Sequence, residues 1–488
     1  MKKVDSIVIL GGGTSAWFSA AYLSHNIPNL KITVIDKEIG TPVGVGEGTL
    51  LNFGPFMQSC GFDMDDWFPK IDATYKSGIL FPNWKNIGNV VWHPFKMNVD
   101  VHPEFSLFDL WSNNQHMEFK KYGLPMHSLS IDQNSIDLNE KYGYHVDCSK
   151  LVMYIKEKLA GRLNFIQSEM VNDCRDENNN IVSLQLKNGQ EVSADLFIDC
   201  TGFRSLLNKN PKKINLLGTR LFCDTAIAGH IPYIDRKKEL RPYVISDAVE
   251  HGWIWNIPVK TRIGSGLVFN RSITDPEDAK DFFVKYWDNR ISKDSLKIID
   301  WTPHYKENFW HNNVVSIGLS AGFIEPLEST GIALITEGIY QLAHRIIDKH
   351  YNGNDINLYN QTMKCFFEES IDFVSMHYSA TERTEPFWQY VKANAVQSEK
   401  QKFLINELSR TDTRVPSKGK NTNFFCGENW SLWLIQLGFA CGERNLNLSK
   451  EQSEFILKTF YNRNEKYRHV WSRNHYEEIE RLENFYAI

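Results

Sequence analysis

Short apolar runs that end in glycine-rich turns dominate the beginning of the chain. Residues 6–10 form an apolar run that ends at Gly11-Gly12-Gly13, a helical segment follows over residues 18–23, and a second apolar run over residues 31–35 ends at Asp36. Apolar runs of this length next to glycine are typical of buried strands. The order of strand, turn, helix and strand predicts a parallel βαβ unit.

Later segments extend this pattern into a mixed sheet and a helical region. Strands are predicted over residues 194–199, 251–258, 263–269 and 314–317, and a hairpin over 181–192 turns at Asn188-Gly189. From about residue 341 the pattern is chiefly helical, with segments over 357–379, 386–395, 430–437 and 450–487. We therefore expect an α/β protein with a mixed β-sheet and a helical C-terminal cap.

Composition and charge exclude several classes of protein. The chain has 488 residues, of which 42% are hydrophobic and 13% aromatic, with 14 tryptophans, so a large core is expected. The net charge of −5 argues against nucleic-acid binding. Eight scattered cysteines without metal spacing indicate reduced thiols and no metal. No apolar run approaches the ~18 residues of a membrane span, and no signal peptide is recognisable, so we expect a cytoplasmic protein.

The first glycine turn has the chemistry of a dinucleotide site. Gly11 suits a tight turn, Gly13 lets the backbone approach a pyrophosphate, and Ala16 is small enough for close helix packing. Asp36 ends the next strand and can accept hydrogen bonds from a ribose, which favours FAD or NAD over NADP. A second glycine-rich loop over residues 44–49 offers further backbone N–H groups, and its alternative interpretation is a simple flexible connection.

Two other stretches carry candidate reactive groups. Lys76 lies alone in a mostly apolar run over residues 72–84, where it either reaches solvent or is desolvated and reactive. Glu328 lies in the turn 318–332, which precedes an amphipathic helix. This turn is either a helix start capped by Ser329 or Thr330 with solvated glutamates, or an anion-binding turn with a carboxylate beside it.

In order along the chain, these motifs closely resemble the flavin-dependent halogenases of the tryptophan-halogenase type. The motifs are Gly11-x-Gly13-Thr14-x-x-Trp17, Lys76 in its aromatic setting, Trp253-x-Trp255-x-Ile257-Pro258 and the segment 323–332. Lesser matches include Tyr144-His145-x-Asp147. The resemblance covers residues 4–395 well. It implies a Rossmann-like FAD-binding core of the two-domain flavin monooxygenase type.

The resemblance also implies a role for each site residue. Reduced FAD, supplied by a separate flavin reductase, and oxygen convert a halide ion into hypohalous acid, which travels to Lys76 and halogenates an aromatic substrate while Glu328 takes the arene's proton. The residues implied for FAD are Gly11, Gly13, Thr14, Ser15, Ala16, Asp36, Gly46, Glu47, Gly202, Gly318 and Ile332. Those implied for chloride, bromide or iodide are Thr330 and Gly331. The implied substrate pocket comprises His93, Pro94, Phe95, Trp253 and Trp255.

The same resemblance suggests a domain organisation and a substrate class. Residues 1–50, 145–225 and 300–350 are expected to form the FAD-binding core, 51–144 and 226–299 a sheet and substrate region, and 351–488 the helical, substrate-binding cap. We find no counterpart of the segment that clamps free tryptophan in the halogenases of that substrate. As natural substrate, an indole, a phenol or a larger aromatic compound is therefore expected at least as much as free tryptophan. A homo-oligomer is possible. Two alternatives remain open: an FAD-dependent aromatic hydroxylase that oxidises a nicotinamide itself, and a non-catalytic flavin-binding subunit.

Overall fold

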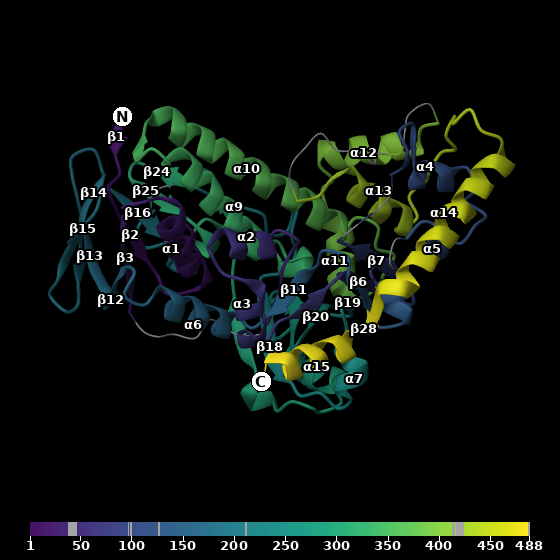
Figure 1. Cartoon of the computed structure of the whole chain (residues 1–488), viewed down its shortest axis with the longest axis horizontal. Coiled ribbons are helices and arrows are strands. Elements are labelled where there is room, and N and C mark those ends of the chain that lie inside the picture. The colour runs from purple at the N-terminus through teal and green to yellow at the C-terminus, as the bar shows by residue number, and fades with distance from the viewer. Residues whose placement is uncertain are drawn as a thin grey trace. The chain divides into compact units, whose positions relative to one another are not determined.

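The chain forms two compact units, each assembled from three stretches of sequence. The computed structural model describes residues 1–37, 46–95, 97, 100–124, 127–209, 212–411, 415 and 424–486 (Figure 1). The first unit comprises Met1–Ala73, Val146–Leu217 and Trp301–Glu368. The second comprises Thr74–His145, Gly218–Asp300 and Glu369–Ile488. None of the helices in these described ranges combines the length and apolarity that a membrane span requires.

The first unit is built on a six-stranded sheet. Its strand order is β12 (Asn164–Gln167), β3 (Lys31–Asp36), β2 (Ser6–Leu10), β16 (Leu196–Asp199), β25 (Val314–Ser316) and β24 (Trp310–His311). The first five strands run parallel, and β24 is antiparallel to β25. Helix α1 (Thr14–Asn26) connects β2 to β3. The predicted βαβ unit and the predicted strands at 194–199 and 314–317 are therefore confirmed.

Both faces of this sheet are covered, which explains the continuous apolar runs of its strands. On one face, Val8, Leu10 and Phe197 pack against a three-stranded sheet of β13 (Met170–Arg175), β14 (Ile181–Leu186) and β15 (Glu191–Ser193). The predicted hairpin at Asn188-Gly189 joins β14 to β15. Helix α1 contacts α6 (Cys148–Leu159) and α9 (Thr330–Arg345). The remaining elements of the unit are short: β1 (Lys2–Lys3), β4 (Glu47–Gly48), α2 (Phe53–Ser59), α3 (Met64–Lys70), β17 (Lys213–Asn215), β23 (His304–Lys306), β26 (Gly322–Phe323) and β27 (His350–Tyr351).

The second unit is built on a seven-stranded mixed sheet. Its order is β22 (Lys297–Asp300), β18 (Thr225–Ile231), β21 (Arg262–Phe269), β20 (Gly252–Val259), β19 (Val244–Val249), β6 (Gly78–Pro82) and β7 (Val90–Pro94). All neighbours are antiparallel except β19 and β6. The predicted pairing of residues 251–258 with 263–269 is confirmed by β20 and β21. A separate strand, β5 (Thr74–Lys76), pairs with β11 (Gly143–Val146).

Helices cover both faces of this second sheet. On one face, Ile254 and Leu267 pack against Phe283 of α8 (Pro276–Tyr286). On the other face, Trp84 lies 6.4 Å from Trp253, measured between ring centroids. The rings of this aromatic layer come partly from α11 (Pro386–Asn394) and α13 (Gly427–Gln436), which supply Trp388 and Trp433. Helix α10 (Gly353–Met376) begins in the first unit and ends in the second.

The helical C-terminal region differs from the prediction at two points, of which the first is the unpredicted helix α12 (Glu399–Ser409). The expected helix over residues 450–487 is divided into α14 (Lys450–Trp471) and α15 (His475–Tyr486) by strand β28 (Ser472–Asn474), and Ala487 lies outside the described residues. Strand β28 pairs with β10 (Ser135–Asp137), a distant partner that local periodicity does not reveal. The other strands and α-helices described in the unit are β8 (Asp100–His102), β9 (Phe105–Ser106), α4 (Leu107–Ser112), α5 (Phe119–Tyr122), α7 (Arg236–Glu239) and α12 (Glu399–Ser409).

Candidate active site

The turn between β2 and α1 has the shape of a phosphate cradle. Gly11 has φ +132°, and a Cβ there would lie 2.2 Å from the carbonyl oxygen of Cys200 on the neighbouring β16. Gly13 is the N-cap of α1 with φ −86°, and a Cβ built on it meets no atom within 4 Å. The N-cap of α1 has no side chain to cap the first N–H groups of the helix. Such a helix start suits a pyrophosphate.

Asp36 lies directly against the same turn. A Cβ on Gly12 would stand 1.8 Å from Oδ2 of Asp36, so only glycine allows the carboxylate this position. Sequence reasoning gave Gly12 no role, although the run of three glycines was visible. It also missed Lys156 of α6, whose Nζ lies 3.9 Å from Asp36 Oδ2 and 5.1 Å from the centroid of the Trp17 indole.

Several of the other residues predicted for FAD lie in this unit as well. A Cβ on Gly318 would lie 2.8 Å from Cβ of Ser15, so the turn 318–332 packs closely on the first turn of α1, next to Thr14. Gly202 follows β16 with φ +68°, and Gly46 has φ +84°. Burial raises the pKa of the Glu47 carboxyl. Ala16 and Ile332 are buried. Gly44 and Val45 of the second glycine-rich loop lie outside the described residues.

The turn 318–332 is not a solvated helix start. Glu325 and Glu328 are both fully buried, with Glu328 ending a short 3-10 turn. Ser329 adopts the left-handed conformation (φ 59°, ψ 32°), and its side chain makes no capping hydrogen bond. The interpretation as a capped start with solvated glutamates is therefore wrong. A non-glycine residue in this conformation costs on the order of 1 kcal/mol, and such strain is common at functional sites.

Thr330 and Gly331, predicted for halide, open α9. Thr330 is fully buried, and its hydroxyl oxygen has no hydrogen-bond partner among the described residues. A Cβ on Gly331 would meet no atom within 4 Å. A buried, unsatisfied donor, backbone N–H groups and free space at a helix N-terminus together fit a small anion.

In the second unit, Lys76 is fully buried at the end of β5. The interpretation that it reaches solvent is therefore wrong. Its Nζ lies 4.4 Å from the centroid of the Phe95 ring, a distance that permits a cation–π interaction. The backbone N–H of Phe95 donates to the carbonyl of Ser77 at 2.9 Å, which holds the backbone of Phe95 next to the residue that follows Lys76.

The other residues predicted for the substrate pocket belong to the same unit. His93 and Pro94 lie at the end of β7, and Nε2 of His93 accepts a hydrogen bond from Nδ2 of Asn429 at 2.8 Å. Asn429 lies far away in sequence and was not predicted. Trp253 and Trp255 point to one face of β20, as predicted, with ring centroids 6.2 Å apart. A Cβ on Gly266 would lie 2.3 Å from the Trp255 ring, so this glycine makes room for the indole.

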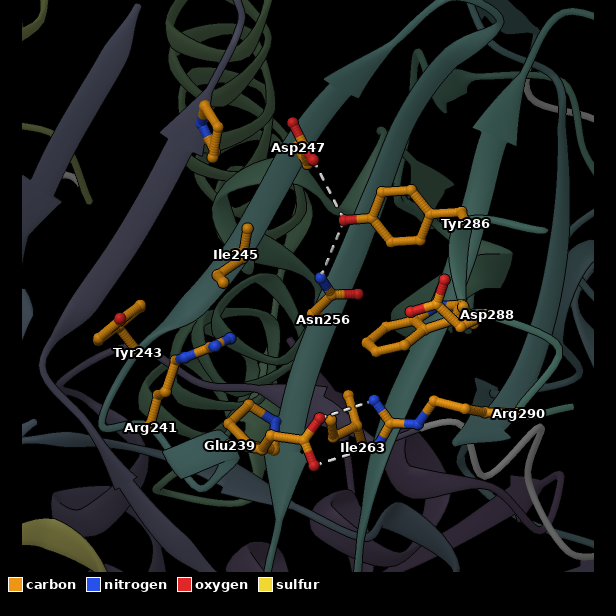
Figure 2. Close-up of a pocket in the computed structure, with 13 residues that line it drawn as sticks. Glu239, Arg241, Tyr243, Ile245, Asp247, Asn256, Ile263, Tyr286, Asp288 and Arg290 are labelled. Atoms are coloured by element: carbon orange, nitrogen blue, oxygen red, sulfur yellow. Dashed lines mark hydrogen bonds and ion pairs between the residues drawn. The ribbon is translucent and has the colours of Figure 1, made fainter. Parts of the chain in front are cut away.

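A hollow of about 310 Å³ lies on the opposite face of the same sheet (Figure 2). Its floor includes Asn256, and the hydroxyl of Tyr286 donates to Oδ2 of Asp247 at 3.1 Å. Nearby, Arg290 and Glu239 form a two-point ion pair at 2.6 and 3.1 Å. None of the site residues predicted from the sequence lines this hollow, and its main polar groups bond to one another.

In the described ranges, no group of His, Cys, Asp or Glu side chains could hold a metal ion.

Comparison with known proteins decides the family. The sequence model described as tryptophan halogenase matches residues 6–448. The chain belongs to the tryptophan halogenase family. This halogenase is 30% identical to the tryptophan 7-halogenase RebH of Lentzea aerocolonigenes, over 79% of its own length and 78% of RebH. It is 29% identical to the tryptophan 6-halogenase ThaL of Streptomyces albogriseolus, with the same coverage of 79% and 78%.

The fold of this halogenase is that of solved family members. A flavin-dependent halogenase from Xanthomonas campestris superposes with a TM-score of 0.90 at 25% identity, covering 99% of both chains. Members of the family are flavin-dependent enzymes that halogenate aromatic compounds electrophilically, and a separate flavin reductase is typical of them. Family membership therefore implies FAD and halide as ligands. The open cradle at Gly13 and the unsatisfied hydroxyl of Thr330 fit these two groups.

Proposed function

We propose that this halogenase transfers a halogen atom from hypohalous acid, held at Lys76, to an indole- or phenol-like arene. The observation that carries the proposal is the complete burial of Lys76 beside Phe95. Burying an ammonium group is costly unless the site compensates for the lost water. Most lysines of folded proteins keep the ammonium group in water, whereas a lysine that donates a hydrogen bond to a small oxidant has to be shielded from it.

The first unit would hold FAD and halide. The backbone around Gly11, Gly13, Thr14 and Ser15 would receive the pyrophosphate at the start of α1, with Ala16 packed behind it, and Asp36 would accept hydrogen bonds from the ribose. The loops that carry Gly46, Glu47, Gly202, Gly318 and Ile332 would surround the rest of the cofactor. Bound reduced FAD would supply, with oxygen, the oxidising power that converts halide into hypohalous acid. The hydroxyl of Thr330 and the N–H of Gly331 would hold the halide.

At Lys76 the chemistry is an electrophilic substitution. The ammonium group donates a hydrogen bond to the oxygen of hypohalous acid and so polarises the oxygen–halogen bond. The arene's π electrons form the new carbon–halogen bond, the oxygen–halogen bond breaks, and the departing hydroxide takes a proton from the Lys76 ammonium group and leaves as water. The ring proton released in the next step balances the one that Lys76 gives up. The cationic ring then loses its proton to a carboxylate, which restores aromaticity. We assign this carboxylate to Glu328.

The two proposed catalytic groups have separate tasks. Lys76 belongs to the second unit, whereas Glu328 belongs to the first. In the proposed reaction, Lys76 donates to the electrophile and Glu328 takes the ring proton. His93, Pro94, Phe95, Trp253 and Trp255 would form the walls around the arene, because flat aromatic ligands pack well on such side chains.

The experiment combines the purified protein with a flavin reductase, a nicotinamide, oxygen, halide and a panel of indoles and phenols, tryptophan included. We expect a product whose mass gains one halogen in place of one hydrogen, and only when reductase, halide and enzyme are all present. Nicotinamide oxidation by the protein alone, with a hydroxylated product, would instead support an aromatic hydroxylase. FAD binding without any arene product across the panel would contradict the proposal and favour a non-catalytic subunit.

A further inference from the structure

His145 is locked in one tautomer. It lies on β11 directly opposite Thr74 of β5 and is fully buried. The hydroxyl of Thr74 donates to the carbonyl of Pro258 at 2.8 Å, and the same oxygen lies 2.8 Å from Nδ1 of His145. A hydroxyl has one proton, so Thr74 must accept from Nδ1–H. The neutral ring therefore presents a lone pair at Nε2.

This lone pair is unsatisfied. Nε2 of His145 is buried and has no hydrogen-bond partner in the described part of the chain. Leaving a buried acceptor unpaired costs about 1–3 kcal/mol, and such groups are rare. Two other buried histidines of the unit differ: Nε2 of His93 accepts from Asn429, and both ring nitrogens of His475 are bonded, to Tyr75 and Leu240. His145 differs from these two histidines in that its free acceptor is available to a small ligand.

The strand register places this acceptor next to the predicted reactive lysine. Lys76 pairs with Gly143, and Thr74 pairs with His145. Side chains two residues apart on a strand share a face, so Lys76 and His145 are diagonal neighbours on one face, and Gly143 contributes no side chain between them. Burial, together with the positive charge of Lys76, holds the pKa of His145 well below its ordinary value. His145 thus remains an uncharged acceptor at neutral pH.

We propose that Nε2 of His145 accepts a hydrogen bond from a small neutral hydroxyl compound held beside Lys76: hypohalous acid during turnover, and water between turnovers. The inference rests on the proposed function. Hypohalous acid has one hydroxyl proton to donate, whereas its oxygen accepts from the ammonium of Lys76. Two fixed partners define the direction of the oxygen–halogen bond, which a single partner does not. His145 therefore binds and orients the oxidant, and no proton is transferred to it.

Two substitutions test the roles of the two ring nitrogens of His145 separately. His145→Asn keeps a donor near the position of Nδ1, toward Thr74, and removes the acceptor at Nε2. His145→Gln places an amide oxygen near Nε2 and gives up the bond to Thr74. Each variant is assayed with the reductase, bromide and an accepted arene, in the presence of a soluble 1,3-diketone that traps escaping hypohalous acid. The readout is the ratio of halogenated arene to halogenated trap, together with total flavin turnover and the unfolding temperature.

We expect His145→Asn to form oxidant at the wild-type rate, with the arene-to-trap ratio lowered at least tenfold, and His145→Gln to recover part of that ratio. A merely structural role would lower flavin turnover and unfolding temperature without releasing oxidant. An unchanged ratio in a folded His145→Asn protein overturns the inference but leaves the proposed function standing. Absence of halogenated arene from the wild type overturns the proposed function itself.

A measurement on the wild-type protein covers the case in which the variants do not fold. Nitrogen-15 NMR of the histidine side chains distinguishes Nδ1–H from Nε2–H tautomers. We expect the Nδ1–H form for His145 from pH 6 to 9. An Nε2–H tautomer or an imidazolium in this range would contradict the inference, because neither leaves an acceptor at Nε2.

Discussion

The ammonium nitrogen of Lys76 lies 4.4 Å from the centroid of the Phe95 ring, and both side chains belong to the second unit. A ring face offers a cation partial negative charge without a hydrogen-bond acceptor, and in a desolvated site this is worth about 2 kcal/mol. The ring therefore stabilises the ammonium group without serving as a hydrogen-bond acceptor for its N–H groups. This arrangement suits a lysine that has to donate to a transient oxidant.

Replacing Phe95 tests this relationship. Phe95→Leu keeps an apolar side chain but removes the ring face, so we expect kcat for arene halogenation to fall about tenfold, which corresponds to a loss of about 1.4 kcal/mol. Phe95→Tyr keeps the ring and should retain most of the activity. Steady-state halogenation with saturating halide gives the comparison. Equal kcat values for the leucine variant and the wild type would show that the ring does not support the lysine.

The halide site is tested at Thr330. We expect Thr330→Val to raise KM for halide by ten- to a hundredfold, because a hydrogen bond to a charged group is worth about 1.5–3 kcal/mol. Its unfolding free energy should be unchanged or slightly higher, since an unsatisfied hydroxyl is removed. The measurement is arene halogenation as a function of bromide concentration.

Thr336→Val on the same helix is the matched control. The hydroxyl of Thr336 is also fully buried, but it accepts from Nδ2 of Asn52 at 2.9 Å and donates to the carbonyl of Ala333 at 2.9 Å. Its loss should cost about 1–3 kcal/mol of stability and leave KM for halide unchanged. The reverse pattern in the two variants would place the halide elsewhere.

Substitutions at Gly12 and Gly13 distinguish the space that the cofactor would occupy from the space that protein atoms fill. Because a Cβ on Gly13 meets no protein atom within 4 Å, Gly13→Ala should not alter the unfolding of the FAD-free protein. We expect it to weaken FAD binding at least tenfold, because the methyl group would enter the space of the pyrophosphate. Gly12→Ala should lower stability as well, since its Cβ would clash with Asp36. Titration with FAD and denaturant unfolding measure the two effects. FAD binding by Gly13→Ala at wild-type affinity would contradict the predicted cofactor position.

A buried lysine outside the proposed chemistry gives a pH-dependent stability. Lys306 donates to Ser205 and Asn208, and burial lowers the pKa of its ammonium from the ordinary 10.5 to about 8. The folded state thus binds this proton more weakly than the unfolded state. Between pH 8 and pH 10 the wild type should therefore gain up to about 1.4 kcal/mol per pH unit relative to Lys306→Met. Denaturant unfolding of both proteins at pH 7, 8, 9 and 10 provides the comparison. A constant difference over this range would mean that Lys306 has an ordinary pKa.

Local patterns in the sequence predict much of the fold because they depend on neighbouring residues. The strands ending at Leu10 and Asp36, and the face shared by Trp253 and Trp255, follow from short-range periodicity. Strand β28 does not, because its partner β10 lies more than three hundred residues away in the sequence. Pairing between distant segments leaves no local signal.

The same distinction between local patterns and distant contacts applies to the candidate site. The motif residues Lys76, Glu328 and Thr330 stood out because of their residue types in an unusual local setting. Their burial decides between the alternatives that the sequence left open, since it excludes a solvated lysine and solvated glutamates. Three residues were missed because their importance arises only from contacts with residues that are distant in the sequence. Asn429 contacts His93, whereas Lys156 and Gly12 both lie against Asp36.

Single-turnover halogenation by Lys76→Met tests the central claim most directly. Enzyme loaded with reduced FAD is mixed with oxygen, bromide and an accepted arene, and product and flavin oxidation are followed together. We expect the variant to oxidise its flavin at the wild-type rate and to form less than about one hundredth of the wild-type halogenated arene. Lys85→Met, which removes a more exposed lysine of the same unit, should behave as the wild type. Halogenated arene from Lys76→Met at the wild-type rate would contradict the role given to this lysine.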